Sequence, residues 1–245
     1  TLPISGCPGE EMRNYNKEKR EMTEKQIRKE DVKILFDSDY VRVADLQYAP
    51  GKHYYDATRR RPEELTAVKS DEEFRAMLPD AVSCIVILDN PEEEAKLVLA
   101  YEFRYPAGRY LLSVPAGLID PEDRDGDNPI QATAIREIRE ETGLQVGEGD
   151  SVKIVNPLLF STPGMTDESN ALVCAVLRSA KQTSLTQEGA VGSEQFDGFA
   201  LLTKRDALEI LQKGCDERGN YYALHTWAAL AYFVSDAWKE EGRGQ

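Results

Sequence analysis

The sequence is poor in the side chains that build the commonest zinc and redox sites. It has two histidines, His53 and His225, which argues against a histidine-based zinc site. Its four cysteines are far apart and include no C-x-x-C pair. Cys84 and Cys174 lie in the apolar runs AVSCIVIL and ALVCAVL, so we expect both to be buried as small hydrophobic residues. This cysteine usage is typical of a reduced, intracellular protein, and we expect a cytoplasmic location.

Long apolar runs and an excess of basic residues are also lacking. No stretch approaches the roughly 18 uninterrupted apolar residues of a membrane-spanning helix. The 245 residues include 30 Lys or Arg and 44 Asp or Glu, a net charge of −14. This balance argues against a nucleic-acid partner bound through its phosphates. The excess acid has two explanations, which are solubility and carboxylates that hold a divalent metal.

Hydrophobic patterning divides the chain into three parts. Residues 1–32 form a polar, charged segment with the composition of a disordered region. Residues 33–79 alternate apolar and polar side chains around a turn at 49–51, which predicts a hairpin, and S-D-E-E at 70–73 predicts a short capped helix. Residues 80–240 form the main predicted domain.

The order of elements in the main domain predicts its fold class. Apolar runs at 81–88, 96–105 and 109–117 predict strands, and 129–142 has helical spacing with Pro129 in its first turn and Gly143 at its end. Three further strands and two helices follow, the second helix covering 220–238. Without βαβ repetition, this order favours a mixed α+β sandwich over a doubly wound parallel sheet.

The predicted helix at 129–142 carries an unfavourable cluster of acids. Glu137 and Glu141 lie four positions apart on one face, with Glu140 beside them, and each like-charged pair costs about 0.2–0.5 kcal/mol. The end of the helix dipole also disfavours anions here. Arg136 and Arg139 offset part of this cost, and a divalent cation such as Mg²⁺ or Mn²⁺ is the stronger candidate. The alternative is a solvated face of mixed charge.

The surroundings of this helix favour the metal. Eight acidic and three basic side chains lie between Asp120 and Glu141, a local net charge of −5. The opposite helix face is expected to be apolar, through Ala132, Ile135 and Ile138. We therefore expect an anchored helix whose acidic face is free to bind.

This segment resembles the Nudix hydrolase box, G-x5-E-x7-R-E-U-x-E-E-x-G-U, where U is aliphatic. Gly117 matches the first glycine, and REIREETGL at 136–144 matches the whole second half. PAGLID at 115–120, EFRYPAGRY at 102–110 and STPGMTDES at 161–169 are similar to the ADP-ribose and ADP-sugar pyrophosphatase branch. The resemblance covers roughly residues 33–238. It implies an α/β/α sandwich with mixed sheets at 80–240 and an N-terminal β-hairpin region at 33–79 for dimerisation.

The sequence departs from this pattern at two places. Gly117 and Arg136 are 19 positions apart where the box has 14, so five residues are inserted. Ser113 stands where the branch commonly has glutamate. The middle glutamate of the box is replaced by one of four candidates, Asn128, Asp127, Glu122 or Asp123.

The resemblance implies a catalytic role for each matched residue. Glu137 and Glu141 would be the main ligands of Mg²⁺, or alternatively Mn²⁺. Glu140 and the carbonyl of Ala116 would complete the set, and Arg136 would orient the glutamates. The general base would come from a later loop, where Glu194 matches best and Glu188 second. The alternative for that loop is a flexible acidic segment.

Substrate contacts follow from the same resemblance. Arg104 would clamp the diphosphate, with a structural ion pair as the alternative. Glu168 would face a ribose, and Gly117, the first glycine of the box, would also belong to the substrate-binding set. Tyr55 would stack on adenine from the partner subunit of a homodimer, with an ordinary strand residue as the alternative.

The function implied is Mg²⁺-dependent hydrolysis of a small nucleoside diphosphate substrate, ADP-ribose or a related ADP-sugar, to AMP and sugar phosphate. One alternative keeps the chemistry and changes the substrate to NADH or a CoA-type compound. Another is a non-catalytic regulator that binds ADP-ribose, which the intact glutamates of the box disfavour. We expect no nucleic acid and no membrane as partner.

Overall fold

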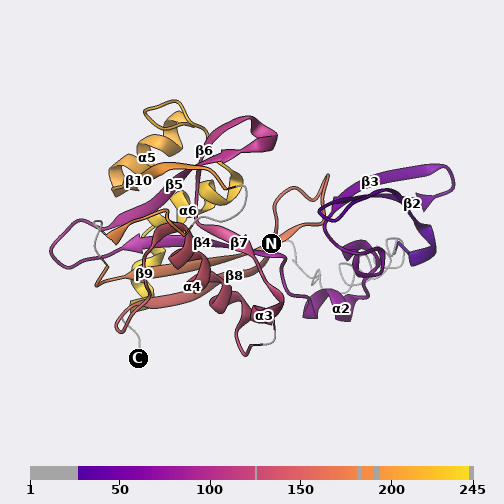
Figure 1. Cartoon of the computed structure of the whole chain (residues 1–245), viewed down its shortest axis with the longest axis horizontal. Helices are drawn as coiled ribbons and strands as arrows, with labels where there is room; N and C mark the ends of the chain where they lie inside the picture. The colour runs from indigo at the N-terminus through magenta and orange to yellow at the C-terminus, as the bar shows by residue number, and fades with distance from the viewer. Residues whose placement is uncertain (1–26, 125, 181–183, 190–193, 243–245) are drawn as a thin grey trace, which may run out of the picture. The chain divides into compact units, whose positions relative to one another are not determined.

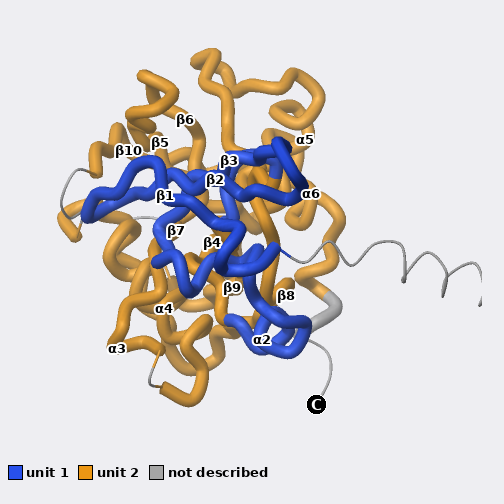
Figure 2. Tube along the Cα trace, turned by 90° about the vertical axis from the view of Figure 1, so that its right-hand side faces the viewer, with its two compact units in different colours: residues 1–77, 164–167 blue, residues 78–163, 168–245 orange. Residues whose placement is uncertain are grey.

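The computed structural model describes residues 27–124, 126–180, 184–189 and 194–242 (Figure 1). Most of the charged segment predicted at 1–32 lies outside these residues. Contacts within the chain define two compact units (Figure 2). Of the described residues, the first unit contains 27–77 and 164–167, and the second contains those within 78–163 and 168–242. Among the described residues, no helix is long and apolar enough to span a membrane.

The first unit holds an antiparallel sheet with the order β1-β2-β3. Its strands are β1 (Val32–Asp37), β2 (Arg42–Ala49) and β3 (Lys52–Thr58), and its helices are η1 (Lys29–Asp31), η2 (Pro62–Glu64), η3 (Thr66–Val68) and α2 (Asp71–Ala76). The predicted β2–β3 hairpin is confirmed, and Gly51 takes the positive φ of 65° that its turn requires. Strand β1 is an addition that the pattern did not predict. The capping box of α2 is also confirmed, because Ser70 and Glu73 hydrogen-bond to each other's backbone N–H.

A distant segment, Gly164–Asp167, completes the first unit. The backbone N–H of Ala57 donates to the carbonyl of Met165 (2.9 Å), and the N–H of Asp167 donates to Oδ1 of Asp56 (2.9 Å). Arg60 lies 3.4 Å from the Asp167 carboxylate. Burial raises the pKa of Asp56 to about 6, and the charge of Asp167 adds to the effect. The unit therefore buries two carboxylates close together.

Replacing Asp56 with asparagine should stabilise the protein at neutral pH. Oδ2 of Asp56 and Oδ1 of Asp167 are buried without a hydrogen-bond partner, and an amide would supply a donor between these acceptors. We expect the free energy of unfolding at pH 7 to rise by about 1–2 kcal/mol. Urea unfolding measures this change, with the exposed Asp39→Asn as control.

The pH dependence of the free energy of unfolding provides a second test of the Asp56→Asn prediction. The folded-state pKa of Asp56, about 6, lies above its ordinary value of 3.8. Its contribution to stability is therefore fully present below pH 3.8 and is lost as the pH rises through 6. The asparagine variant should lack this decline, and a variant less stable than the wild type at pH 7 would contradict the argument.

The second unit is built on a mixed seven-stranded sheet with the order β10-β5-β4-β9-β8, in which β6 pairs with β5 and β7 with β4. All pairs are antiparallel except β4 with β9. The strands are β4 (Ala81–Leu88), β5 (Lys96–Arg104), β6 (Arg109–Ser113), β7 (Ala116–Leu118), β8 (Ser151–Phe160), β9 (Ser169–Leu177) and β10 (Phe196–Leu202). The helices are α3 (Pro121–Arg124), α4 (Pro129–Thr142), α5 (Lys204–Lys213) and α6 (Leu224–Val234), with η4 (Tyr105–Ala107) and η6 (Ala237–Gly242).

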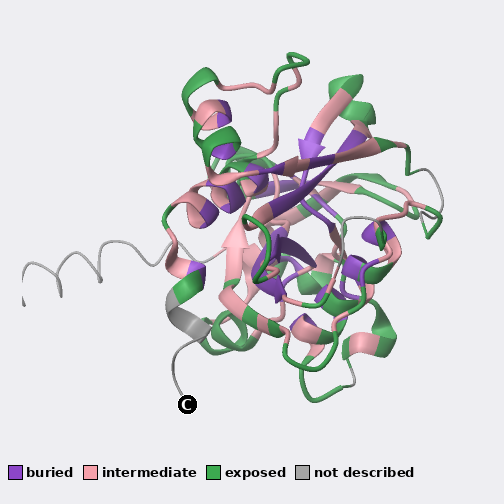
Figure 3. Ribbon diagram, turned by 90° about the vertical axis from the view of Figure 1, so that its left-hand side faces the viewer, coloured by how far each residue is buried: buried purple, intermediate pink, exposed green. Residues whose placement is uncertain are grey.

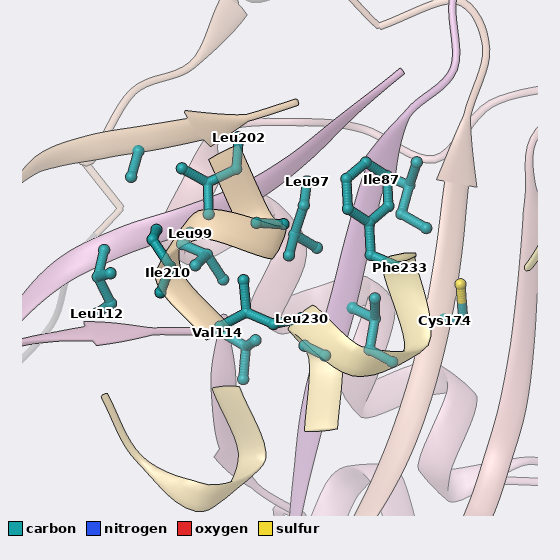
Figure 4. Packing of buried hydrophobic residues seen from close by; sticks show 14 of the residues in the cluster. Ile87, Leu97, Leu99, Leu112, Val114, Cys174, Leu202, Ile210, Leu230 and Phe233 are labelled. Atoms are coloured by element: carbon teal, nitrogen blue, oxygen red, sulfur yellow. The ribbon is translucent and has the colours of Figure 1, made fainter. Parts of the chain in front are cut away.

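Both faces of this sheet are covered, which gives the expected α/β/α sandwich. Along β4, Cys84 and Val86 point into one core, and Ile85 and Ile87 into the other. The first core is closed by α4, and the second by α5 and α6 (Figures 3 and 4). This is why β4 and β9 contain continuous apolar runs and have every residue buried. Cys84 and Cys174 are buried, as predicted, and neither forms a disulfide.

The last helix departs from the prediction in extent and exposure. The sequence predicts a helix over 220–238, but α6 starts at Leu224. Its apolar residues were expected to lie in the core or at a subunit interface. Leu230 and Phe233 do lie in the core, but Leu224 and Trp227 are 60% and 50% exposed. The pattern alone does not separate core from surface positions here, because apolar residues occur on more than one side of this short helix. A subunit interface at Leu224 and Trp227 stays a prediction.

Candidate active site

Helix α4 places the glutamates Glu137 and Glu141 on a buried face rather than a free one. It begins at Pro129 and ends where Gly143 takes a φ of 71°, as predicted. Glu137 and Glu141 are 6% and 5% exposed, on the same side as the core residue Ile138. The expectation of a free acidic face opposite an apolar one was therefore wrong. Ile135, expected in the core, is 41% exposed.

Arg136 forms hydrogen bonds with three carboxylates and one backbone carbonyl of this site. Its Nη1 donates to Oε1 of Glu137 (2.7 Å) and Oε2 of Glu140 (3.1 Å). Its Nη2 donates to the carbonyl of Leu118 (2.9 Å) and, with Nε, to Oδ2 of Asp123 (3.1 and 3.2 Å). Partial burial disfavours the charged guanidinium, but the carboxylates, Glu137 first, raise the pKa of Arg136 above its usual range. The side chain thus holds α4 to the preceding loop and fixes two glutamates.

The stretch between Gly117 and Arg136, which is longer than the box predicts, supplies one of the carboxylates bound by Arg136. Pro121–Arg124 in this stretch form the short helix α3, which the sequence did not predict. Asp123 on this helix accepts hydrogen bonds from Arg136 and from the hydroxyl of Thr133 (3.0 Å). Of the four candidates for the middle carboxylate of the pattern, Asp123 is thus hydrogen-bonded to the arginine.

Glu141 is the most perturbed carboxyl of the cluster. Burial raises its pKa to about 9, and the charge of Glu102 contributes most among its acidic neighbours, followed by Glu137 and Glu194. The backbone N–H of Ala116 donates to Oε1 of Glu141 (3.3 Å) and opposes the shift. The site therefore contains more carboxylates than its positive charges compensate.

Glu137 shows the same effect to a smaller extent. Burial raises its pKa to about 7, although Arg136 favours its charged form. Glu140 and Glu194 add repulsion. The side chain of Glu140 is more open, at 30% exposed, and also meets Arg139 Nη2 at 3.4 Å.

Glu102 belongs to this cluster, although sequence reasoning gave it no role. It lies near the end of β5 and is 8% exposed. Its carboxylate forms an ion pair with Arg104 (2.6 Å), and burial raises its pKa. The hydroxyl of Ser113 favours the charged form of Glu102, although no hydrogen bond of ordinary geometry joins them. A usable signal was present, namely an acid inside the apolar run KLVLAYEF.

Gly117 brings the backbone of β7 against the acid cluster. A Cβ built on this residue would overlap the carboxylate of Glu137. A glycine is therefore required here by close approach, and not by a special φ angle.

Replacing Gly117 with alanine should displace Glu137 without unfolding the protein. We expect catalytic efficiency to fall by roughly ten- to a hundredfold, as for the loss of a group that orients a metal ligand. The matched control is Gly147→Ala, because its added Cβ would meet its nearest neighbours at 3.8 Å or more. Equal kcat/KM in both variants would show that the position of Glu137 is unimportant.

The two candidates for the general base lie in different surroundings. Glu194 is exposed and directly follows the undescribed residues 190–193, and its charge acts on Glu102, Glu137 and Glu141. Glu188 is exposed too, and its N–H donates to the hydroxyl of Thr186 (3.3 Å). Glu194 is therefore the candidate that electrostatics links to the cluster.

The predicted substrate residues fall in both units. Arg104 has a side chain 44% exposed, and its charge acts on His225, as does that of Glu168. Burial lowers the pKa of His225, whose Nε2 lies 3.0 Å from the hydroxyl of Ser161. Sequence reasoning gave His225 no part in the site. Tyr55 belongs to the first unit, on β3, and is 57% exposed.

The donor set suits a hard divalent cation in its chemistry. Within the described part of the chain, no group of three or more acidic, histidine or cysteine side chains is already arranged at metal-binding geometry. However, Glu102, Glu137 and Glu141 are each more than nine-tenths buried and repel one another. A divalent cation bound by carboxylate oxygens would relieve that repulsion.

Comparisons with known proteins agree with the pattern in the sequence. The NUDIX domain family model matches residues 77–223. An ADP-sugar pyrophosphatase of Mus musculus is 32% identical over 129 residues, which are 53% of this chain and 55% of that protein. Putative nudix hydrolase 2 of Caenorhabditis elegans is 41% identical over 91 residues, 36% of this chain and 37% of that protein. The chain thus spans about half, or less, of the length of these relatives.

One solved structure was matched over most of the chain. It is described as an ADP compounds hydrolase and shares 18% sequence identity, with a TM-score of 0.48. The match covers 87% of this chain and 94% of that one.

Proposed function

Because the chain belongs to the Nudix family of hydrolases, we propose that it cleaves the diphosphate bond of ADP-ribose or a related ADP-sugar. Water would add across the P–O–P bond, so that one phosphate leaves with adenosine as AMP and the other with the sugar. The names of the mouse relative, an ADP-sugar pyrophosphatase, and of a Bacillus subtilis relative, an ADP-ribose pyrophosphatase, support this substrate class. Each is similar to part of this chain.

The observation that carries the proposal is the buried pair Glu137 and Glu141 on one helix, Glu137 bound by Arg136 and Glu141 by the N–H of Ala116. Two carboxylates with raised pKa values on one helix are a costly arrangement, and their use is to hold a cation. Glu137 and Glu141 would bind Mg²⁺, or Mn²⁺ in its place, with Glu140 and the carbonyl of Ala116 as further ligands. The bound ion would neutralise the diphosphate and lower the pKa of a water molecule.

The remaining roles belong to the protein's own side chains. Arg136 keeps the glutamates in place through charge-assisted hydrogen bonds. Glu194 would accept the proton of the attacking water, because its carboxylate is the exposed one whose charge reaches the cluster. Asp123 would hold Arg136 in the role that the box assigns to its middle glutamate.

Recognition of the substrate would use residues around this centre. Arg104 would clamp the diphosphate, because its guanidinium is half exposed beside the cluster. Glu168 would face a ribose, and Gly117, which lies against the carboxylate of Glu137, would belong to the same substrate-binding set. Tyr55 would stack on the adenine of a site in the partner subunit.

A panel of nucleoside diphosphate compounds tests this function. ADP-ribose, an ADP-sugar, NADH and a CoA compound would each be incubated with Mg²⁺ or Mn²⁺, and the products separated by chromatography. We expect AMP to form fastest from ADP-ribose or the ADP-sugar. Faster cleavage of NADH or the CoA compound would keep the chemistry and change the substrate. Binding of ADP-ribose without any product would identify a non-catalytic regulator instead.

A homodimer is the second part of the proposal. It is supported by the hairpin region of residues 33–79, which resembles the region that branch members exchange between subunits. Sedimentation at micromolar concentration should show a dimer. A monomer at that concentration would contradict both the dimer and the role of Tyr55 in a shared site.

A further inference from the structure

Glu102 is buried at a place where a strand would ordinarily carry an apolar side chain. It is 8% exposed, and its neighbour Tyr101 is 7% exposed. Strand β5 pairs with β6 and β10 on its two sides, and Glu102 lies opposite Leu111 and Phe196. A buried carboxylate is costly unless its charge is compensated. The free-energy cost of burying the Glu102 carboxylate must therefore be offset by an interaction or by a function.

A structural ion pair with Arg104 is the simplest reason, and it explains only part of the arrangement. The two groups meet at 2.6 Å, but the arginine side chain is 44% exposed while the glutamate carboxylate is 11% exposed. An exposed guanidinium is partly screened by water and compensates a buried charge incompletely. A pair that served the fold alone would also avoid a second buried acid nearby.

Such an acid is present, because Glu102 lies beside Glu141. Among the acidic neighbours of Glu141, Glu102 acts on it most strongly, more than Glu137 on the same helix. The two carboxylates come from different elements, β5 and α4, which meet at β6 and β7. Ser113 on β6 pairs with Ala100 on β5, and the N–H of Ala116 on β7 donates to Oε1 of Glu141 (3.3 Å). The hydroxyl of Ser113, 3% exposed and without a hydrogen-bond partner, lies there too. Converging carboxylates from separate elements are the arrangement by which proteins surround a hard cation.

We infer that Glu102 is a further metal-binding carboxylate of this site, and that Arg104 pairs with it only while the site holds no cation. The inference rests on the proposed function and deepens it. Arg104 then has two partners in turn, the Glu102 carboxylate in the metal-free protein and the anionic substrate in the complex. Binding of the cation would draw Glu102 away from Arg104 and leave the guanidinium for the substrate.

Two substitutions separate this role from a structural one. Glu102→Gln keeps the size of the side chain and removes its charge, and Arg104→Gln removes the cation that competes for Glu102. The probe is Mn²⁺ alone, whose affinity for the substrate-free protein is measured by isothermal titration calorimetry. The control is Glu148→Gln, which removes an exposed carboxylate of the same unit.

The expected results differ in direction between the two variants. Glu102→Gln should weaken Mn²⁺ binding by at least about tenfold. Arg104→Gln should leave Mn²⁺ binding unchanged or tighten it, while raising KM for the diphosphate substrate. If Glu102 served only to position Arg104, both variants would bind Mn²⁺ like the wild type and share a raised KM. That result would overturn the inference.

Thermal unfolding distinguishes a variant that has lost Mn²⁺ binding from one that has failed to fold. Metal-free Glu102→Gln should unfold near the wild-type temperature, and Mn²⁺ should raise its Tm less than it raises the wild-type Tm. Glu102→Asp, which retains the charge, should bind Mn²⁺ more tightly than the glutamine variant. If Glu102→Gln bound Mn²⁺ as tightly as the wild type while Glu141→Gln did not, the metal site would stand and Glu102 would not be one of its ligands. Full Mn²⁺ affinity in both would remove the proposed metal site itself.

Discussion

Replacing Glu141 with glutamine is expected to reduce turnover of ADP-ribose by more than about a hundredfold while the fold is retained. Loss of a group that merely supports a metal ligand costs about 10–100-fold, and Glu141 is proposed as a ligand itself. The amide has the same size and can still accept the hydrogen bond of the Ala116 N–H. Steady-state kinetics with saturating Mg²⁺ measures the effect, and circular dichroism checks the fold.

The same variant should change how stability depends on pH. The folded-state pKa of Glu141, about 9, lies above its ordinary value of 4.5. Its contribution to stability is therefore fully present below pH 4.5 and is lost as the pH rises through 9. Glutamine stays neutral, so the metal-free variant should be at least as stable as the metal-free wild type at pH 8. A clearly less stable variant would show that the carboxylate serves the fold.

Replacing Arg136 with glutamine should damage both stability and activity. Arg136 is 23% exposed and binds three carboxylates and a backbone carbonyl, and it lies 3.2 Å from a fourth carboxylate, that of Asp120. Breaking a buried ion pair on one side costs about 3–5 kcal/mol, and partial exposure places this loss near 3 kcal/mol. Turnover should fall with it, because Glu137 loses the donor that fixes its position.

The matched control for this change is Arg139→Gln on the same helix. Its side chain is 61% exposed and meets one carboxylate, that of Glu140, at 3.4 Å. The free energy of unfolding should therefore change by no more than about 0.5 kcal/mol. Urea unfolding of both variants measures the contrast. Equal losses would show that Arg136 is an ordinary surface arginine.

The parts of the fold that local sequence determines were predicted well. The bounds 129–142 of α4 follow from a proline that suits a first turn and a glycine that suits a left-handed cap, and both effects act within a few residues. Strand β4 follows from eight successive residues that are all buried. Strand β1 was missed because its exposed residues, Leu35 and Phe36 among them, break the alternation that marks a half-buried strand.

The site could be predicted only where its residues share one helix. Glu137, Glu140 and Glu141 follow from helical spacing, whereas Glu102 reaches Glu141 across the fold from another element. His225 and Ser161 likewise come together from residues 64 positions apart. The burial of the acidic face was also not predictable from the pattern, because it depends on the sheet that α4 covers.

The central claim is that the buried glutamates serve metal-dependent cleavage of a diphosphate, and release of AMP tests it most directly. Wild type and Glu141→Gln would be incubated with ADP-ribose, with Mg²⁺ or with EDTA, and AMP would be quantified by chromatography. We predict AMP from the wild type with Mg²⁺, and at most about a hundredth of that rate in the other three reactions. Equal AMP formation by wild type and variant in Mg²⁺, or by the wild type in EDTA, would contradict the claim.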